Sequence, residues 1–283
     1  NSMNPQPGPI GIFDSGYGGL TILKQLKEDL PDYTYIYYGD NARAPYGNRS
    51  FETVTHYTQQ CVETLLNKGC NLIILACNTA SAKALRTIQQ TYLTQIEPFK
   101  RVLGVIRPTT ERVDRYTRSG HVGILGTSGT VASMSYPIEI AKFFPNIKVY
   151  QQACPMWVPL IENNEHAGEG ADYFIKKYLD QLLSQSPLID TIILGCTHYP
   201  LIQDKIKAFL PDHIRVVSQS SIVSHSLQDY LKRHPSMEQI CLKSSKIEYY
   251  TSDDPGTFNK MAEVFFGEQV NSKHLEAGSG IDL

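Results

Sequence analysis

Two cysteines stand at matching places in the chain. Cys77 follows the apolar run Leu72 to Ala76, and Cys196 follows the run Thr191 to Leu194 after one glycine. A thiolate can remove a proton from carbon, and a helix N-terminus beside it stabilises the negative charge. One such cysteine alone is more commonly a small buried apolar residue. Because there are two, we interpret them as catalytic thiols that act on one small substrate.

Polar side chains follow both thiols. Asn78 and Thr79 come after the first, and Thr197 and His198 come after the second. An imidazole two residues from Cys196 can polarise that thiol or deliver protons. Helix capping alone is the alternative role for Asn78 or Thr79.

The first apolar run ends in an acidic residue. Asp14 closes the run that begins at Ile10, and it could cap a helix near Leu20 or serve the site. The glycine-rich stretch Gly16 to Gly19 lets backbone approach a ligand closely. It matches the dinucleotide fingerprint only in part, and no Cys-x-x-Cys or His-x-x-x-His spacing occurs. We expect neither a metal ion nor a cofactor.

Seven short apolar runs can form the strands that position these residues. Longer segments with apolar residues three or four apart separate the runs and predict helices. Alternating strands and helices predict an α/β fold with mainly parallel sheets. The expected strands are Ile10 to Phe13, Tyr35 to Tyr38, Leu72 to Ala76, Val102 to Ile106, Val122 to Leu125, Ile147 to Tyr150 and Thr191 to Leu194.

Parts of the sequence repeat at an interval of roughly 115 residues. The stretch Ile10 to Gly16 resembles Val122 to Gly129, and Leu72 to Thr79 resembles Thr191 to His198. Two similar α/β units in tandem are the simplest interpretation. The segment after about Val217 is too short for a third domain, so we expect it to pack onto one of the two.

Composition narrows the class of protein. The 283 residues carry a formal net charge of −2 spread along the chain, so we expect a small-molecule partner rather than nucleic acid or a membrane. No apolar run approaches the roughly 20 residues that span a bilayer, and the polar start does not resemble a signal peptide. We expect a cytoplasmic location and six free thiols.

An ordered set of motifs resembles the glutamate racemases of the cofactor-independent aspartate/glutamate racemase superfamily. From Ile10 to about Val217 the order and spacing fit. The motifs are Gly11 to Gly16, Tyr38-Gly39-Asp40, Ala42-Arg43, Pro45-Tyr46-Gly47, Ala76 to Ala80, Leu125-Gly126-Thr127 with Thr130, Val158 to Glu162 and Leu194 to Leu201.

The resemblance implies two domains related by a pseudo-twofold, with the active site in the cleft between them. The first domain would comprise residues 6–103 and 217–272, and the second residues 104–216. It implies interconversion of L- and D-glutamate without a cofactor, a supply of D-glutamate for peptidoglycan, and a homodimer. Relatives activated by a cell-wall precursor carry an N-terminal extension, and we expect no such activation here because the first strand starts near Ile10.

The resemblance also implies roles for individual residues. Cys77 would be the base toward D-glutamate and Cys196 the base toward L-glutamate, each acting as the acid in the reverse direction. Asp14 would assist Cys77, and His198 with Glu162 would assist Cys196. The implied substrate contacts are Asp14, Ser15, Pro45, Tyr46, Gly47, Asn78, Thr79, Thr127, Thr130, Thr197 and His198.

Two departures and two alternatives accompany this prediction. The chain has Arg107-Pro108-Thr109 where relatives often carry Glu-Pro-Gly, and Gln219-Ser220-Ser221 where Gly-Ala-Glu is usual. One alternative is a racemase for aspartate or a related amino acid. The other is a non-catalytic binding or regulatory protein.

Overall fold

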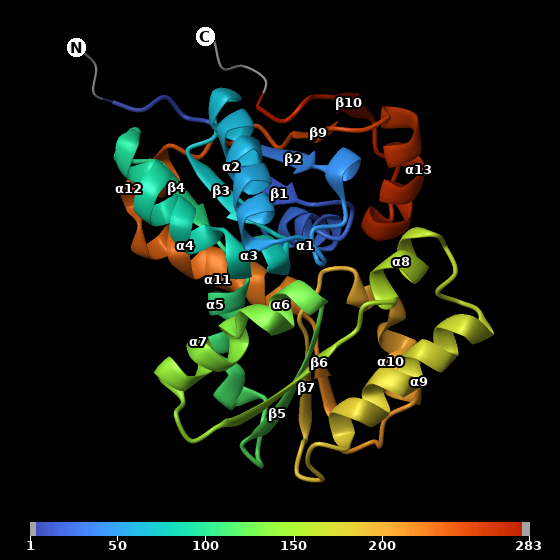
Figure 1. Cartoon of the computed structure of the whole chain (residues 1–283). Coiled ribbons are helices and arrows are strands. Elements are labelled where there is room, and N and C mark those ends of the chain that lie inside the picture. The colour runs from blue at the N-terminus through green and yellow to red at the C-terminus, as the bar shows by residue number, and fades with distance from the viewer. Residues whose placement is uncertain (1–3, 279–283) are drawn as a thin grey trace.

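Among the residues that the structure describes, ten parallel strands form two separate sheets. The computed structural model describes residues 4–278. The larger sheet has the order β10-β9-β2-β1-β3-β4, and the smaller has the order β6-β5-β7-β8 (Figure 1). The strands of the larger sheet are β1 (Ile10–Asp14), β2 (Tyr35–Gly39), β3 (Leu72–Leu75), β4 (Arg101–Leu103), β9 (Ile247–Thr251) and β10 (Ser272–His274). Those of the smaller sheet are β5 (His121–Gly126), β6 (Lys148–Ala153), β7 (Thr191–Leu194) and β8 (Arg215–Val217).

Helices connect the strands of each sheet. In the first half of the chain they are α1 (Leu20–Asp29), α2 (Phe51–Asn67), α3 (Asn78–Lys83) and α4 (Leu85–Thr87), followed by a π-helix (Ile88–Tyr92). The helices that follow are α5 (Ile106–Thr110), α6 (Ser128–Ser133), α7 (Ser135–Phe143), α8 (Trp157–Glu162), α9 (Glu169–Leu183) and α10 (Gln203–Ala208). The last three are α11 (Gln219–Arg233), α12 (Pro235–Gln239) and α13 (Pro255–Phe266). Short 3₁₀ turns occupy Asn41–Arg43, Leu93–Gln95, Val113–Arg115 and Tyr199–Ile202.

Side chains along β1 alternate between the two faces of the larger sheet and so belong to two different apolar clusters. Ile10 and Ile12 of β1 belong to the apolar cluster that contains residues of α1, α11 and α13. Phe13 belongs to the cluster that contains residues of α2 and α3 on the opposite face. All five residues of β1 are buried. This burial on both faces explains why the strand is a continuous apolar run.

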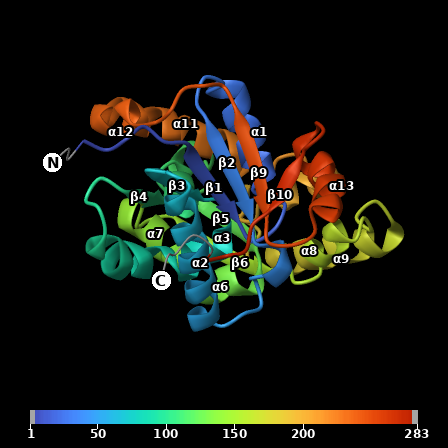
Figure 2. The same ribbon diagram turned by 90° about the horizontal axis from the view of Figure 1, so that it is seen from above.

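The expected α/β class with parallel sheets in two units is confirmed, and the two sheets share a topology. The order β2-β1-β3-β4 in one matches β6-β5-β7-β8 in the other. The segment after Val217 returns to the first sheet, where β9 pairs with β2 (Figure 2). The expected domain boundary at 103/104 coincides with the end of β4, whereas the one at 216/217 falls inside β8, one residue before the strand ends. The domain division stays a prediction.

Several element boundaries differ from the sequence prediction. The strand expected over Val102 to Ile106 ends at Leu103, because the chain leaves the sheet at Gly104 and Ile106 begins α5. The strand expected to end at Tyr150 continues to Ala153. Strands β8, β9 and β10 were not predicted. Among residues 4–278, no helix has the length and apolar character needed to cross a bilayer.

Candidate active site

One cavity is lined by Asp14 of β1 and by the loops and helices at the carboxyl ends of strands of both sheets. In parallel α/β sheets this edge is where ligands bind. The first half of the chain supplies Asp14, Ser15, Pro45, Tyr46, Gly47, Asn48, Cys77, Asn78 and Thr79. The second half supplies Thr127, Ser128, Cys154, Pro155, Val158, Pro159, Glu162, Cys196, Thr197 and His198. The two thiols therefore share one cavity, as predicted.

Cys77 is the N-cap of α3. Its sulfur accepts a hydrogen bond from the Ala80 backbone N–H at 3.4 Å, and the thiol donates to Ser15 Oγ at 3.6 Å. Burial and, to a smaller extent, the negative charge of Asp14 raise the pKa of Cys77 to about 12. The hydrogen bonds from Ala80 and to Ser15 act in the opposite direction. Cys77 is therefore a protonated thiol near neutral pH. Capping of α3, the alternative role considered for Asn78 or Thr79, is carried out by Cys77.

Asp14 lies buried at the end of β1. Its Oδ2 accepts the backbone N–H groups of Gly19, at 3.0 Å, and Gly16, at 3.3 Å. Burial raises the pKa of Asp14, and the nearby His198 charge and these N–H groups partly offset that rise. Asp14 thus partly fills the helix-capping role that was its alternative, since it accepts the N–H of Gly19, the residue before α1. The carboxyl also lines the cavity beside Cys77.

Cys196 follows β7 and has a different environment. His198 Nδ1 lies 3.9 Å from the Cys196 sulfur, and His198 Nε2 lies 2.8 Å from Glu162 Oε1. Burial lowers the pKa of His198, but contacts with Cys196 and Glu162 outweigh it and raise that pKa well above its usual value. A cationic imidazole stabilises negative charge on the sulfur beside it. The two thiols thus have opposite settings, with Cys77 beside a carboxyl and Cys196 beside a cation.

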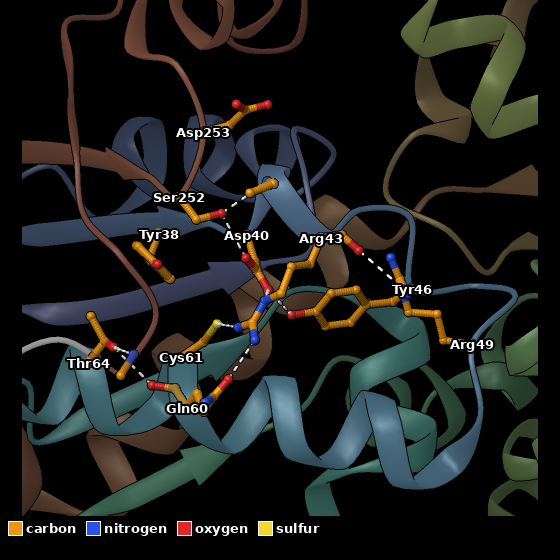
Figure 3. Close-up of polar contacts among 12 residues, drawn as sticks. Tyr38, Asp40, Arg43, Tyr46, Arg49, Gln60, Cys61, Thr64, Ser252 and Asp253 are labelled. Carbon is orange, nitrogen blue, oxygen red and sulfur yellow. Dashed lines mark hydrogen bonds and ion pairs between the residues drawn. The ribbon is translucent and has the colours of Figure 1, made fainter.

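A loop between β2 and α2 brings Pro45, Tyr46 and Gly47 to the cavity. The Tyr46 hydroxyl donates to Asp40 Oδ2 at 2.5 Å, and Arg43 Nε donates to the same oxygen at 2.7 Å. Figure 3 shows this carboxylate between the tyrosine and the guanidinium. Asp40 is fully buried, so these donors offset the cost of removing its charge from water. They hold the loop in place.

Hydroxyls connect the two halves across the cavity. Thr79 Oγ1 lies 2.8 Å from Thr127 Oγ1, and the Gly129 N–H donates to Gly47 O at 2.8 Å. Thr127 caps α6 by accepting the N–H of Thr130. The predicted contact from Thr130 differs from the others, because this residue is fully buried behind Thr127 and does not line the cavity.

A second close approach joins the halves near His198. An added Cβ at Gly18 would lie 2.3 Å from Thr197 Oγ1 and 2.5 Å from His198 Nδ1. The Thr21 hydroxyl donates to the Thr197 carbonyl at 3.2 Å. Only glycine leaves room for the imidazole here, so Gly18 has a spatial role that goes beyond backbone freedom.

Sequence reasoning did not select six of the lining residues as site residues. They are Asn48, Ser128, Cys154, Pro155, Val158 and Pro159. Asn48 and Ser128 directly follow predicted residues, and that adjacency was an available signal. Cys154 follows the polar strand end Gln151-Gln152-Ala153, which no apolar run marks. Among residues 4–278, no group of three or more His, Cys, Asp or Glu side chains is arranged to hold a metal ion.

Comparisons with known proteins agree with this geometry. The family model for Asp/Glu/Hydantoin racemase matches residues 20–222. A glutamate racemase of Aquifex aeolicus is 36% identical over 93% of this chain and 96% of its own length. A second one, from Caldanaerobacter subterraneus, is 39% identical over 93% of this chain and 95% of its own.

Solved structures show the same similarity. Glutamate racemase from Bacillus anthracis superposes with a TM-score of 0.86 at 30% identity, covering 96% of this chain and 98% of that one. Glutamate racemase from Francisella tularensis, in complex with D-glutamate, gives 0.83 at 33% identity over 97% and 98%. Sequence identity and fold thus agree over nearly the whole chain, and the family model matches most of it, so the chain belongs to the Asp/Glu/Hydantoin racemase family.

Proposed function

We propose that this chain is a glutamate racemase, which interconverts L- and D-glutamate and supplies D-glutamate for peptidoglycan. The observation that carries the proposal is the shared cavity, which is lined by two cysteines that follow strands of different sheets, each with its own acid-base partner. Inverting a carbon centre by proton transfer requires one group to remove the proton and another to return it on the opposite face. A pair of thiols meets that requirement without a cofactor.

In the proposed reaction each cysteine is the base in one direction and the acid in the other. From L-glutamate, the Cys196 thiolate takes the α-proton, and the electron pair of the broken C–H bond stays on the α-carbon and its carboxylate. Cys77 then gives its thiol proton to the other face, forming the new C–H bond of D-glutamate and leaving a thiolate. From D-glutamate the two roles exchange. Asp14 assists Cys77, and the pair of His198 and Glu162 assists Cys196.

The remaining polar groups bind and orient the substrate. An α-proton beside a carboxylate is very weakly acidic, so the site must stabilise the negative charge that forms on the α-carbon. Hydroxyl, amide and backbone N–H donors suit two carboxylates. We assign this binding to Ser15, Asn78, Thr79, Thr127, Thr197 and the loop Pro45-Tyr46-Gly47. Thr130 supports Thr127 from behind.

Deuterium incorporation tests the proposal. The purified protein is incubated with each glutamate enantiomer in deuterated water with no added cofactor, and optical rotation and α-deuterium are followed. We expect racemisation from either enantiomer with deuterium in the product, because each thiol proton exchanges with solvent. Cys77→Ser and Cys196→Ser should each abolish turnover. The matched control is Cys70→Ala, at a buried thiol outside the cavity.

Other outcomes separate the alternatives. Racemisation of aspartate in preference to glutamate would assign the chain to the related activity. Glutamate binding that survives loss of both cysteines, with no turnover in the wild type, would identify a binding protein. Near-normal turnover by either serine variant would remove the proposed roles of the thiols.

Oligomeric state and location complete the proposal. We assign a homodimer in the cytoplasm, supported by the resemblance to glutamate racemases. We also propose the domain division at 103/104 and 216/217, of which the first boundary coincides with the end of β4. Analytical ultracentrifugation tests the dimer, and a monomer across the micromolar range would overturn it. Cell fractionation tests the location.

A further inference from the structure

Gln219 forms a closed ring of hydrogen bonds with two other buried side chains. Its Oε1 accepts from Asn78 Nδ2 at 2.7 Å, and its Nε2 donates to the Tyr136 hydroxyl at 2.6 Å. The Tyr136 hydroxyl donates in turn to Asn78 Oδ1 at 2.7 Å. Gln219 is 3% exposed and does not line the cavity, whereas Asn78 directly follows Cys77 and does.

The direction of every hydrogen bond in the ring follows from its surroundings. The Thr109 hydroxyl donates to the Val105 carbonyl at 3.0 Å, so both oxygens present only lone pairs to Gln219. The Gln219 amide nitrogen must therefore face them, and it does so at 3.1 and 3.3 Å. Its oxygen consequently faces Asn78. This fixes the Asn78 amide with its nitrogen toward Gln219 and its oxygen toward Tyr136.

The ring stands where the chain passes between the two sheets. Val105 lies between β4 and α5, at the first passage, and Gln219 begins α11 after β8, at the return. Asn78 begins α3 and Tyr136 lies in α7, so the ring joins helices that follow strands of both sheets. Gln219 is also a position at which this chain departs from the usual family pattern. The ring requires a side chain there that both donates and accepts, and the glycine usual at this position has none.

We propose that Gln219 is a positioning residue for catalysis, which acts with Tyr136 to hold the Asn78 amide so that its second N–H is available to the substrate. This inference rests on the proposed glutamate racemisation. The amide of Asn78 has one nitrogen hydrogen outside the ring, and this hydrogen suits a substrate carboxylate. Without the ring, the amide can rotate and lose that donor.

Gln219→Met tests the inference, because methionine has a similar volume and cannot complete the ring. We expect KM for both enantiomers to rise about tenfold, the loss of roughly one hydrogen bond, with kcat changed less than about twofold. Tyr136→Phe, a milder change, should raise KM similarly. The double variant should show about the same tenfold rise instead of a hundredfold one, because each change breaks the same ring.

The control and the kinetic pattern separate positioning from folding. Ser221→Ala changes an exposed residue in the same first turn of α11 and should keep wild-type KM. A variant that only lost stability would contain less active protein, which lowers apparent kcat and leaves KM unchanged. Unchanged KM in Gln219→Met and Tyr136→Phe, or effects that multiply in the double variant, would overturn the inference. If the wild type does not racemise glutamate, the proposed function fails separately, and calorimetric Kd for D-glutamate then tests the ring by the same criteria.

Discussion

Replacing Glu162 with glutamine removes one negative charge and leaves the shape of the site intact. The glutamine oxygen can still accept from His198 Nε2, which lies 2.8 Å from the carboxylate in the native protein. Hydrogen bonds to charged partners contribute about 1.5–3 kcal/mol and neutral ones about 0.5–1.5 kcal/mol. The substitution should therefore destabilise the His198 imidazolium by about 1.4 kcal/mol, which corresponds to a decrease of about one unit in the pKa of His198.

The sign of the pH effect follows from this loss. Glu162 is one of the groups that raise the pKa of His198, so removing its charge lowers that pKa. The imidazolium then loses its proton at lower pH, and the stabilisation of the Cys196 thiolate is lost with it. We expect the alkaline limb of kcat/KM to move down by about one pH unit, with about a tenfold loss of kcat/KM above that limb.

Circular dichroism follows both directions in one assay. The enantiomers have equal free energies, so kcat/KM must be the same from either side, and the two measurements check each other. Glu165→Gln is the matched control, since this exposed carboxylate lies three residues further along outside the cavity. An alkaline limb that stays in place, or an equal shift in the control, would refute the electrostatic role of Glu162.

Three further predictions concern packing and stability. Tyr46→Phe leaves the buried Asp40 with one hydrogen-bond donor fewer and should lower the free energy of unfolding by about 1–3 kcal/mol and raise KM. Tyr57→Phe, which changes the neighbouring ring, should do neither. Urea unfolding and measurement of KM check both variants. Gly18→Ala should reduce kcat/KM at least about tenfold, because the added methyl group displaces His198. Gly170→Ala is the control, since Gly170 has open space around it, and should keep the native kcat/KM. Equal kcat/KM in the two variants would contradict the close contact between Gly18 and His198. Burial raises the pKa of Cys70 from 9.0 to about 12, so the neutral thiol's contribution to stability is complete below pH 9 and is lost above pH 9 at about 1.4 kcal/mol per pH unit. Between pH 9 and 10, the urea midpoint of Cys70→Ala should therefore fall less steeply than that of the native protein. Equal slopes for the two proteins would contradict the raised pKa of Cys70.

Apolar runs predicted the central strands because these strands are buried on both faces. β1, β3, β5 and β7 each appear in the sequence as a continuous apolar segment. β9 and β10 do not, since charged or polar residues interrupt β9 and make up β10, and their positions come from pairing with β2 and with each other. A three-residue strand such as β8 is too short to show a period.

Sequence reasoning selected cavity-lining residues where neighbours in sequence are also neighbours in space. Cys77 with Asn78 and Cys196 with His198 are such neighbours, and the family motifs supplied the more distant partners. The support of Tyr46 by Asp40 and of Asn78 by Gln219 was not predicted. The second of these joins residues 141 positions apart, and only the folded chain reveals such a contact.

The matching strand order of the two sheets limits what symmetry can contribute to the reaction. Halves built from the same chirality of amino acid can be related by rotation but never by reflection. A rotation that exchanged the halves would turn a bound enantiomer into another orientation of the same enantiomer. Substrate and product, however, are mirror images of each other. The repeat thus explains why there are two thiols, but it cannot require their surroundings to be alike, and evolution was free to place a carboxyl beside one and an imidazole beside the other.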